Sequence, residues 1–104
     1  MIRRITTTEA ADADIRDIAT YIAFDNAYAA RQFGAELWES FQRIAENPEI
    51  GHTVLEFDEL RVFRVSNRFQ RYLVFYRSRD VETVEVVRVL HGARDIKLLL
   101  QDIP

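Results

Sequence analysis

The sequence predicts an α+β fold in which a small antiparallel sheet carries an N-terminal helical hairpin on one face and a short C-terminal helix. Two long segments with apolar residues at helical spacing precede residue 48, and three segments rich in Val, Phe, Tyr and Leu follow residue 60. The polar connections between those three segments are typical of tight turns, so we expect consecutive antiparallel strands. At 104 residues without a linker-like stretch, residues 1–104 are expected to form a single domain.

The chain is expected to open with a short edge strand over Ile2–Thr7, followed by a helix. Thr6 and Glu9 fit a capping box, which predicts that the helix begins there. An apolar stripe then recurs at helical spacing through Ala11, Ile15, Ile18, Ala19 and Ile22. This stripe is expected to face the core.

A second helix is expected to begin at Asp25 or Asn26 and to run to about Asn47, before Pro48. Gly34 lies inside it, where Gly costs about 1 kcal/mol relative to Ala, and close helix packing is our explanation for it. No function is assigned to the aromatic residues outside the stripes, Tyr21, Tyr28 and Trp38. The short link predicts an antiparallel hairpin whose second stripe is Ala30, Phe33, Leu37, Phe41 and Ile44.

The sheet is expected to contain strands over Arg61–Val65, Arg71–Arg77 and Val84–His91. Both faces of these strands are largely apolar, so we expect both to be covered. Pro48–Glu59 is interpreted as an irregular acidic connection, and a closing helix is expected to begin near Ala93.

Composition narrows the range of functions. Without cysteine, the chain has neither disulfides nor thiolate metal sites, which favours the reducing cytosol, and its two separated histidines predict no metal site. We expect no cofactor. The N-terminus has no apolar run typical of a signal peptide, and no stretch of about 18 apolar residues predicts a membrane span.

The net charge of −3 hides an uneven distribution. Residues 1–59 hold twelve acidic residues against five arginines, whereas residues 60–104 hold nine basic residues against five acidic ones. Within the predicted strands lie five arginines: Arg61, Arg64, Arg71, Arg77 and Arg88. They indicate an anionic partner, either phosphate or a carboxylate-rich protein segment. The alternative is that they pair internally with the acidic helices.

Several segments resemble the ParE toxins of the RelE/ParE toxin–antitoxin superfamily. They are DIRDIATYIAFDNAYAARQF, NPEIGH, LRVFRVSNRFQRYLVFYR and VVRVLHGARDI, in the family's order and from about Asp14 to Leu100. RYLVFYR followed by RVLHGARDI is the more specific pair. The resemblance implies a toxin held inactive by a cognate ParD-like antitoxin, usually encoded beside it, whose C-terminal segment wraps the toxin. ParE-like toxins are associated with poisoning DNA gyrase, and RelE-like toxins with cutting messenger RNA on the ribosome.

RNA cleavage through the ribose 2′-hydroxyl needs a base, an acid and cations for the phosphate charge. Arg64 and Arg71 lie approximately where the resemblance places the sheet cations of RelE-like nucleases. The last tyrosine, however, is Tyr76, and arginine is a poor proton-transfer group at neutral pH. His91 is therefore the one plausible general acid or base in this region, and its alternative role is to cap the turn before Gly92.

We therefore expect a gyrase-binding toxin that acts by binding, with no catalytic residue of its own. The residues expected to contact the antitoxin or the target are Arg61, Arg64, Arg71, Arg77, Arg88, His91 and Arg94. Direct sequence-specific nucleic-acid binding and membrane contact are not expected. The alternatives are a ribosome-dependent messenger RNA endoribonuclease that uses His91 with Arg64 and Arg71, and a degenerate toxin retained as an antitoxin-binding domain.

Overall fold

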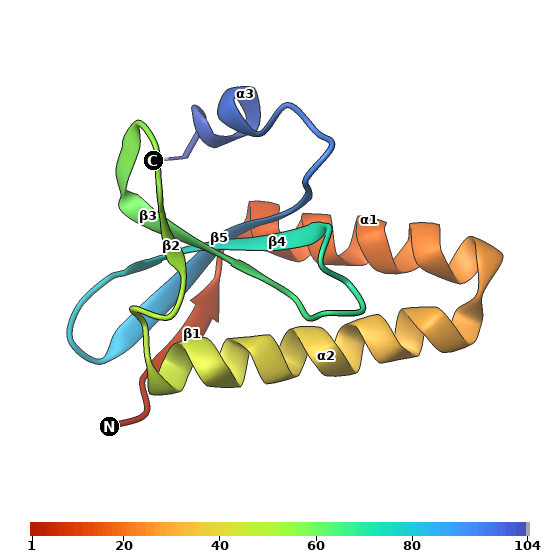
Figure 1. The fold of residues 1–104 in the computed structure, drawn as a ribbon, viewed down its shortest axis with the longest axis horizontal. Coiled ribbons are helices and arrows are strands. Elements are labelled where there is room, and N and C mark those ends of the chain that lie inside the picture. Colours follow the sequence, from red (N-terminus) through yellow and green to blue (C-terminus); the bar gives the residue numbers. More distant parts are fainter. Residues whose placement is uncertain (104) are drawn as a thin grey trace.

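The structure is a computed structural model that describes residues 1–103 (Figure 1). It confirms the expected α+β fold, with a helical hairpin, a five-stranded sheet and a short C-terminal helix. None of the helices in these residues is long and apolar enough to cross a lipid bilayer. The elements in chain order are β1 (Arg4–Thr7), α1 (Glu9–Asp25), α2 (Ala27–Glu46), β2 (His52–Val54), β3 (Phe57–Arg64), β4 (Tyr72–Ser78), β5 (Thr83–His91) and α3 (Ile96–Leu100).

The strands lie in the order β1-β5-β4-β3-β2. The three consecutive strands β3, β4 and β5 are antiparallel, as expected. The sheet is nevertheless mixed, because β1 pairs in parallel with the outer edge of β5, from Arg4 opposite Thr83 to Thr7 opposite Val86. Beyond Thr7 the chain turns away into α1, so the last part of β5 has no strand on that side.

The segment expected to be an irregular connection contains β2 and the first residues of β3. The two strands are antiparallel, and Glu56, in the turn between them, has a positive φ of 72°. The sequence does not predict β2, because its three residues, HTV, are too few to show an alternating pattern.

The caps of the helices agree with the sequence only in part. α1 begins at Glu9 and is capped by Thr8, whose hydroxyl accepts a hydrogen bond from the N–H of Ala11 at 3.0 Å. The capping box expected from Thr6 is wrong, because Thr6 lies in β1. Asn26 caps α2, as one of the two expected residues, and α3 begins at Ile96 rather than near Ala93.

The sheet has a core on each face, so both faces are covered as expected. Figure 1 shows α3 on the opposite side of the sheet from α2. The helical hairpin packs on one face, around buried residues that include Phe33, Phe41, Ile44, Val74, Tyr76, Val84, Val86 and Val89. The smaller core beneath α3 contains Leu60, Phe75, Val87, Leu90 and Leu100.

Gly34 takes no part in close packing. It is exposed on α2, and a Cβ added to it would have no atom outside its own helix turn within 4 Å. The packing explanation for this glycine is therefore wrong.

Candidate functional site

The strand arginines do not form one surface, because the register places them on both faces of the sheet. Arg61 lies opposite Tyr76, whose side chain belongs to the core beneath the helical hairpin. Arg64 lies opposite Leu73, which packs against the core beneath α3. Residues paired across antiparallel strands share a face, so Arg61 and Arg64 point to opposite sides.

Arg88 is held by an acidic residue of α1. Its Nε and Nη2 donate to the two carboxylate oxygens of Asp14 at 2.7 and 2.8 Å. Both side chains are largely buried, and the bond to Asp14 is the main cause that raises the pKa of Arg88 above its usual value. The internal pairing considered as an alternative therefore applies to Arg88, which contributes little to an exposed basic surface.

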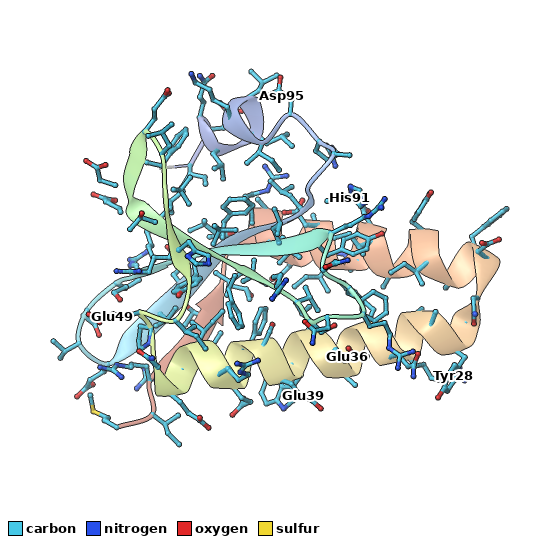
Figure 2. All side chains as sticks on the ribbon, viewed as in Figure 1. Tyr28, Glu36, Glu39, Glu49, His91 and Asp95 are labelled. Atoms are coloured by element: carbon cyan, nitrogen blue, oxygen red, sulfur yellow. The ribbon has the colours of Figure 1, made fainter. Side chains whose placement is uncertain are left out.

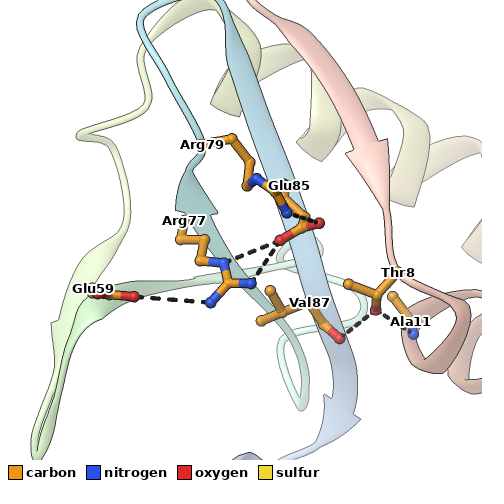
Figure 3. A network of polar contacts seen from close by, with 7 residues as sticks. All are labelled: Thr8, Ala11, Glu59, Arg77, Arg79, Glu85 and Val87. Carbon is orange, nitrogen blue, oxygen red and sulfur yellow. Dashed lines mark hydrogen bonds and ion pairs between the residues drawn. The ribbon is translucent and has the colours of Figure 1, made fainter. Parts of the chain in front are cut away.

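Arg77 belongs to a network of charged side chains on β3, β4 and β5 (Figure 3). Its guanidinium bonds Glu85 at 3.0 Å, and the same carboxylate accepts from Arg79 at 2.9 Å. Glu59 adds a longer contact to Arg77 at 3.8 Å. Because Arg77 and Glu85 are largely buried side chains, this network orders the end of the sheet.

Arg61 lines a polar hollow of about 490 Å³ together with Tyr76, Arg77 and Arg79. Its Nη1 donates to the carbonyl of Gly51 at 2.8 Å. The hydroxyl of Tyr76 donates to the carbonyl of Pro48 at 2.7 Å and accepts from the N–H of Gly51 at 2.9 Å. Burial raises the pKa of Tyr76 above its usual value. This corner ties the loop before β2 to the sheet.

Three of the expected site residues, Arg64, Arg71 and Arg94, are exposed. Within residues 1–103, their side chains have no hydrogen bond or ion pair. Arg64 lines a polar groove of about 590 Å³ between α2 and the end of β3, with Arg43 and Arg68 beside it. Arg68 is paired with Glu36 at 3.3 Å, so the cations without an ion pair that line this groove, among the described residues, are Arg43 and Arg64.

His91 ends β5 and is partly buried (Figure 2). Its Nδ1 accepts a hydrogen bond from the N–H of Ala93 at 3.0 Å, and its ring meets Tyr72 edge-on at 5.0 Å. One ring nitrogen therefore caps the turn, which is the alternative role expected for this residue. Asp95 does not pair with the neighbouring Arg94 in residues 1–103; its carboxylate caps α3 by accepting from the N–H of Leu98 at 3.3 Å.

Sequence reasoning missed the residues that engage these arginines, above all Asp14 and Glu85. Asp14 lies 74 positions from Arg88, so no local pattern joins them.

The sequence does indicate another feature that was not assigned a function, a pair of aromatic residues on α1 that lie outside its apolar stripe. Tyr21 and Phe24 fall outside the apolar stripe of α1, and both are strongly exposed. Within residues 1–103, no group of three His, Cys, Asp or Glu side chains is arranged to hold a metal ion.

Comparisons with known proteins converge on one family. Residues 5–96 match the family model described as ParE toxin of type II toxin-antitoxin system, parDE. The chain is 33% identical over 98 residues to Toxin ParE1 of Mycobacterium tuberculosis, in strains CDC 1551 / Oshkosh and ATCC 25618 / H37Rv; the match covers 92% of this chain and 96% of the relative. Its fold resembles the solved structure "Chromosomal ParDE TA system from P. aeruginosa", with a TM-score of 0.69, 15% identity, and coverage of 86% and 96% of the two chains.

Proposed function

This chain belongs to the ParE toxin family of type II toxin–antitoxin systems, and we propose that it inhibits growth by poisoning DNA gyrase until a cognate ParD-like antitoxin covers it. The matched relatives are named as toxins, and the matched structure is that of a ParDE system. The family resemblance associates such toxins with gyrase.

The observation that supports a binding mechanism is that two exposed arginines have no partner among the described residues. Arg64 and Arg71 are exposed, and within residues 1–103 neither side chain has a hydrogen bond or an ion pair. Guanidinium groups left without a carboxylate in the free protein are suited to forked contacts with the carboxylates or phosphates of a partner. Arg61, Arg77 and Arg88 contribute mainly to the fold through Gly51, Glu85 and Asp14.

The state of His91 supports the same conclusion. Its Nδ1 is engaged by the turn. The exposed cations nearby are arginines, and a guanidinium is a poor proton-transfer group at neutral pH. Proton transfer at two positions, as RNA cleavage requires, has a single candidate residue here. A toxin that traps another enzyme on its DNA needs no proton-transfer residue of its own.

The test is purified DNA gyrase with supercoiled plasmid and ATP, with and without this protein. We expect trapped double-strand breaks that require both gyrase and the protein. The variant Arg31→Ala should still trap these breaks, because it removes an exposed arginine of α2 whose only described partner is the ring of Tyr28. No trapped breaks at high excess of folded, antitoxin-free protein would reject gyrase as the target.

One observation favours a second function, ribosome-dependent cleavage of messenger RNA. The N–H of Gly92 donates to the carbonyl of Arg71 at 2.7 Å, which brings the start of β4 beside the turn that holds His91 and Arg94. The imidazole of His91 thus lies at the same end of the sheet as the exposed Arg71 and Arg94. This function predicts codon-phased breaks in messenger RNA after induction and their loss in His91→Ala, whereas gyrase poisoning predicts induction of the DNA-damage response.

A further inference from the structure

The polar hollow of about 490 Å³ at the end of β4 is lined by three arginines, Arg61, Arg77 and Arg79, and is here called the arginine hollow. The hydroxyl-bearing residues Tyr76 and Ser78 line it as well. None of the exposed arginines on which the proposed function rests lines this hollow. Its chemistry is therefore separate from that function.

The arginine hollow holds more positive than negative charge. Figure 3 shows the guanidinium groups of Arg77 and Arg79 bonded to one carboxylate, that of Glu85, at 3.0 and 2.9 Å. Glu59 supplies a second carboxylate, but its side chain is 83% exposed and its contact to Arg77 is 3.8 Å long. Within residues 1–103, Arg61 has no ion pair. Three cations thus share one closely bound carboxylate and one distant one.

Two of these guanidinium groups keep donors for a ligand. Arg61 donates through Nη1 to the carbonyls of Gly51 at 2.8 Å and Glu49 at 3.5 Å, and Arg79 donates through Nη1 to Glu85. Within residues 1–103, Nε and Nη2 of Arg61 and of Arg79 have no hydrogen bond. A guanidinium presents five N–H donors in a planar fork that fits the oxygens of an anion. An anion can therefore bind here without breaking the contacts to Gly51 and Glu85.

The cations are held in place before any ligand binds. The side chain of Arg77 is 16% exposed and bonds Glu85 through two of its nitrogen atoms. Arg61 is fixed by the carbonyl of Gly51, whose N–H in turn donates to the hydroxyl of Tyr76 at 2.9 Å. Side chains that are ordered beforehand lose less conformational entropy on binding. The arginine hollow is therefore a preorganised cationic site.

The lining selects a terminal phosphate group among anions. A carboxylate offers two oxygens and one negative charge, whereas a terminal phosphate offers three acceptor oxygens and a charge of about −1.5 to −2 at neutral pH. Three guanidinium groups match the phosphate better. A nucleobase would need an aromatic face for stacking, and the aromatic residue that lines the hollow in the described part of the chain, Tyr76, is only 1% exposed.

We propose that the arginine hollow binds a terminal phosphate group through Arg61, Arg77 and Arg79, and that the carboxylate of Glu59 moves aside when it binds. This site does not depend on the proposed function. Two sources present the same chemistry: a small phosphate compound, and the 5′-phosphate end of a nucleic-acid strand.

The test is isothermal titration calorimetry of pyrophosphate into four full-length chains at one low ionic strength. They are wild type, the hollow variant Arg61→Gln/Arg79→Gln, Glu59→Gln, and the control Arg16→Gln/Arg31→Gln, which removes two charges from exposed positions of the helical hairpin. We expect the hollow variant to lose about tenfold or more in affinity and the control less than about threefold. Glu59→Gln should bind about threefold more tightly, because it removes the competing carboxylate, and damaged folding cannot produce such a gain.

A second titration identifies the source of the phosphate. It compares a DNA duplex with 5′-phosphate ends and the same duplex with 5′-hydroxyl ends. Tighter binding of the phosphorylated duplex, lost in the hollow variant, would support the site and identify a strand end. Equal binding of the two duplexes, with pyrophosphate binding retained, would support it and identify a small phosphate compound. Wild-type affinity for pyrophosphate in the hollow variant, equal losses in the hollow and control variants, or no pyrophosphate binding by the folded wild type would each overturn the proposal.

Discussion

The carboxylate of Asp14 accepts hydrogen bonds from Nε and Nη2 of Arg88 at 2.7 and 2.8 Å, and so joins α1 to β5 across 74 positions of the sequence. The same carboxylate accepts the main-chain N–H of Val89 at 3.0 Å. One side chain therefore neutralises a largely buried arginine and closes the part of the β5 edge that β1 does not reach. This contact adds to the apolar core that holds the helical hairpin on the sheet.

Asp14→Ala is expected to lower the free energy of unfolding by about 3–5 kcal/mol, because it leaves the guanidinium of Arg88 buried without its partner. The N–H of Val89 loses its acceptor as well. Urea denaturation followed by circular dichroism measures the change. Asp12→Ala is the matched control, since Asp12 is exposed in the first turn of the same helix, and we expect it to cost less than about 1 kcal/mol. Equal costs for the two variants would show that the buried pair does not set stability.

Tyr76→Phe tests the corner that holds the loop before β2. The substitution keeps the buried ring but removes the hydroxyl that bonds the carbonyl of Pro48 and the N–H of Gly51. We expect a loss of about 1–3 kcal/mol in the free energy of unfolding. The control is Tyr28→Phe, whose hydroxyl is exposed and accepts from Gln32 alone among the described residues, and it is expected to change stability by less than about 0.5 kcal/mol.

The same hydroxyl predicts a pH dependence. Burial raises the pKa of Tyr76 above its usual 10.0, against weaker opposing effects of the Gly51 hydrogen bond and of Arg61. A pKa raised by folding means that the stabilisation is fully present below about pH 10 and is lost as the pH rises through the folded-state pKa. The stability of the wild type should therefore fall more steeply above about pH 10 than that of Tyr76→Phe. Parallel curves from about pH 8 to 11, measured by urea denaturation, would contradict this assignment.

The two glycines at Gly34 and Gly51 are expected to respond in opposite directions to alanine. Gly34 is exposed in the interior of α2 with free space around it, so Gly34→Ala should raise the free energy of unfolding by about 0.5–1 kcal/mol. At Gly51 an added Cβ would lie 2.6 Å from the hydroxyl of Tyr76 and 2.8 Å from the carbonyl of Val62, so alanine should destabilise. Melting temperatures of the two variants, one above and one below wild type, are the readout.

The sequence predicts the parts of this fold that carry long periodic patterns. The two helices and strands β3, β4 and β5 were found because apolar residues repeat along each of them. The wrong predictions concern β2 and the N-cap of α1. Strand β2 has only three residues, too few for a pattern. Three threonines precede α1, and the parallel pairing of β1 with β5 leaves Thr8 as the residue that caps the helix. Gly34 shows that an unfavourable residue in a helix need not have a packing role.

The candidate site was less predictable, because the role of each arginine depends on register. The sequence shows that Arg61 and Arg64 belong to one strand and, being three positions apart, point to opposite faces, but which face each side chain takes follows from the pairing with β4. The partners of Arg77 and Arg88 lie 8 and 74 positions away, and only the folded sheet brings them within bonding distance. Only the structure therefore shows which arginines remain exposed.

Arg64→Ala/Arg71→Ala tests the arginines that remain exposed. Neither side chain has a described partner within residues 1–103, so the double variant should keep the melting temperature of the wild type. If both contact carboxylates or phosphates of a partner, antitoxin affinity should fall by about tenfold or more at low salt, and growth inhibition should weaken. Arg16→Ala/Arg31→Ala removes two exposed arginines of the helical hairpin and is expected to keep both activities. Wild-type toxicity and affinity in the Arg64/Arg71 variant, measured beside this control, would remove these two residues from the binding surface.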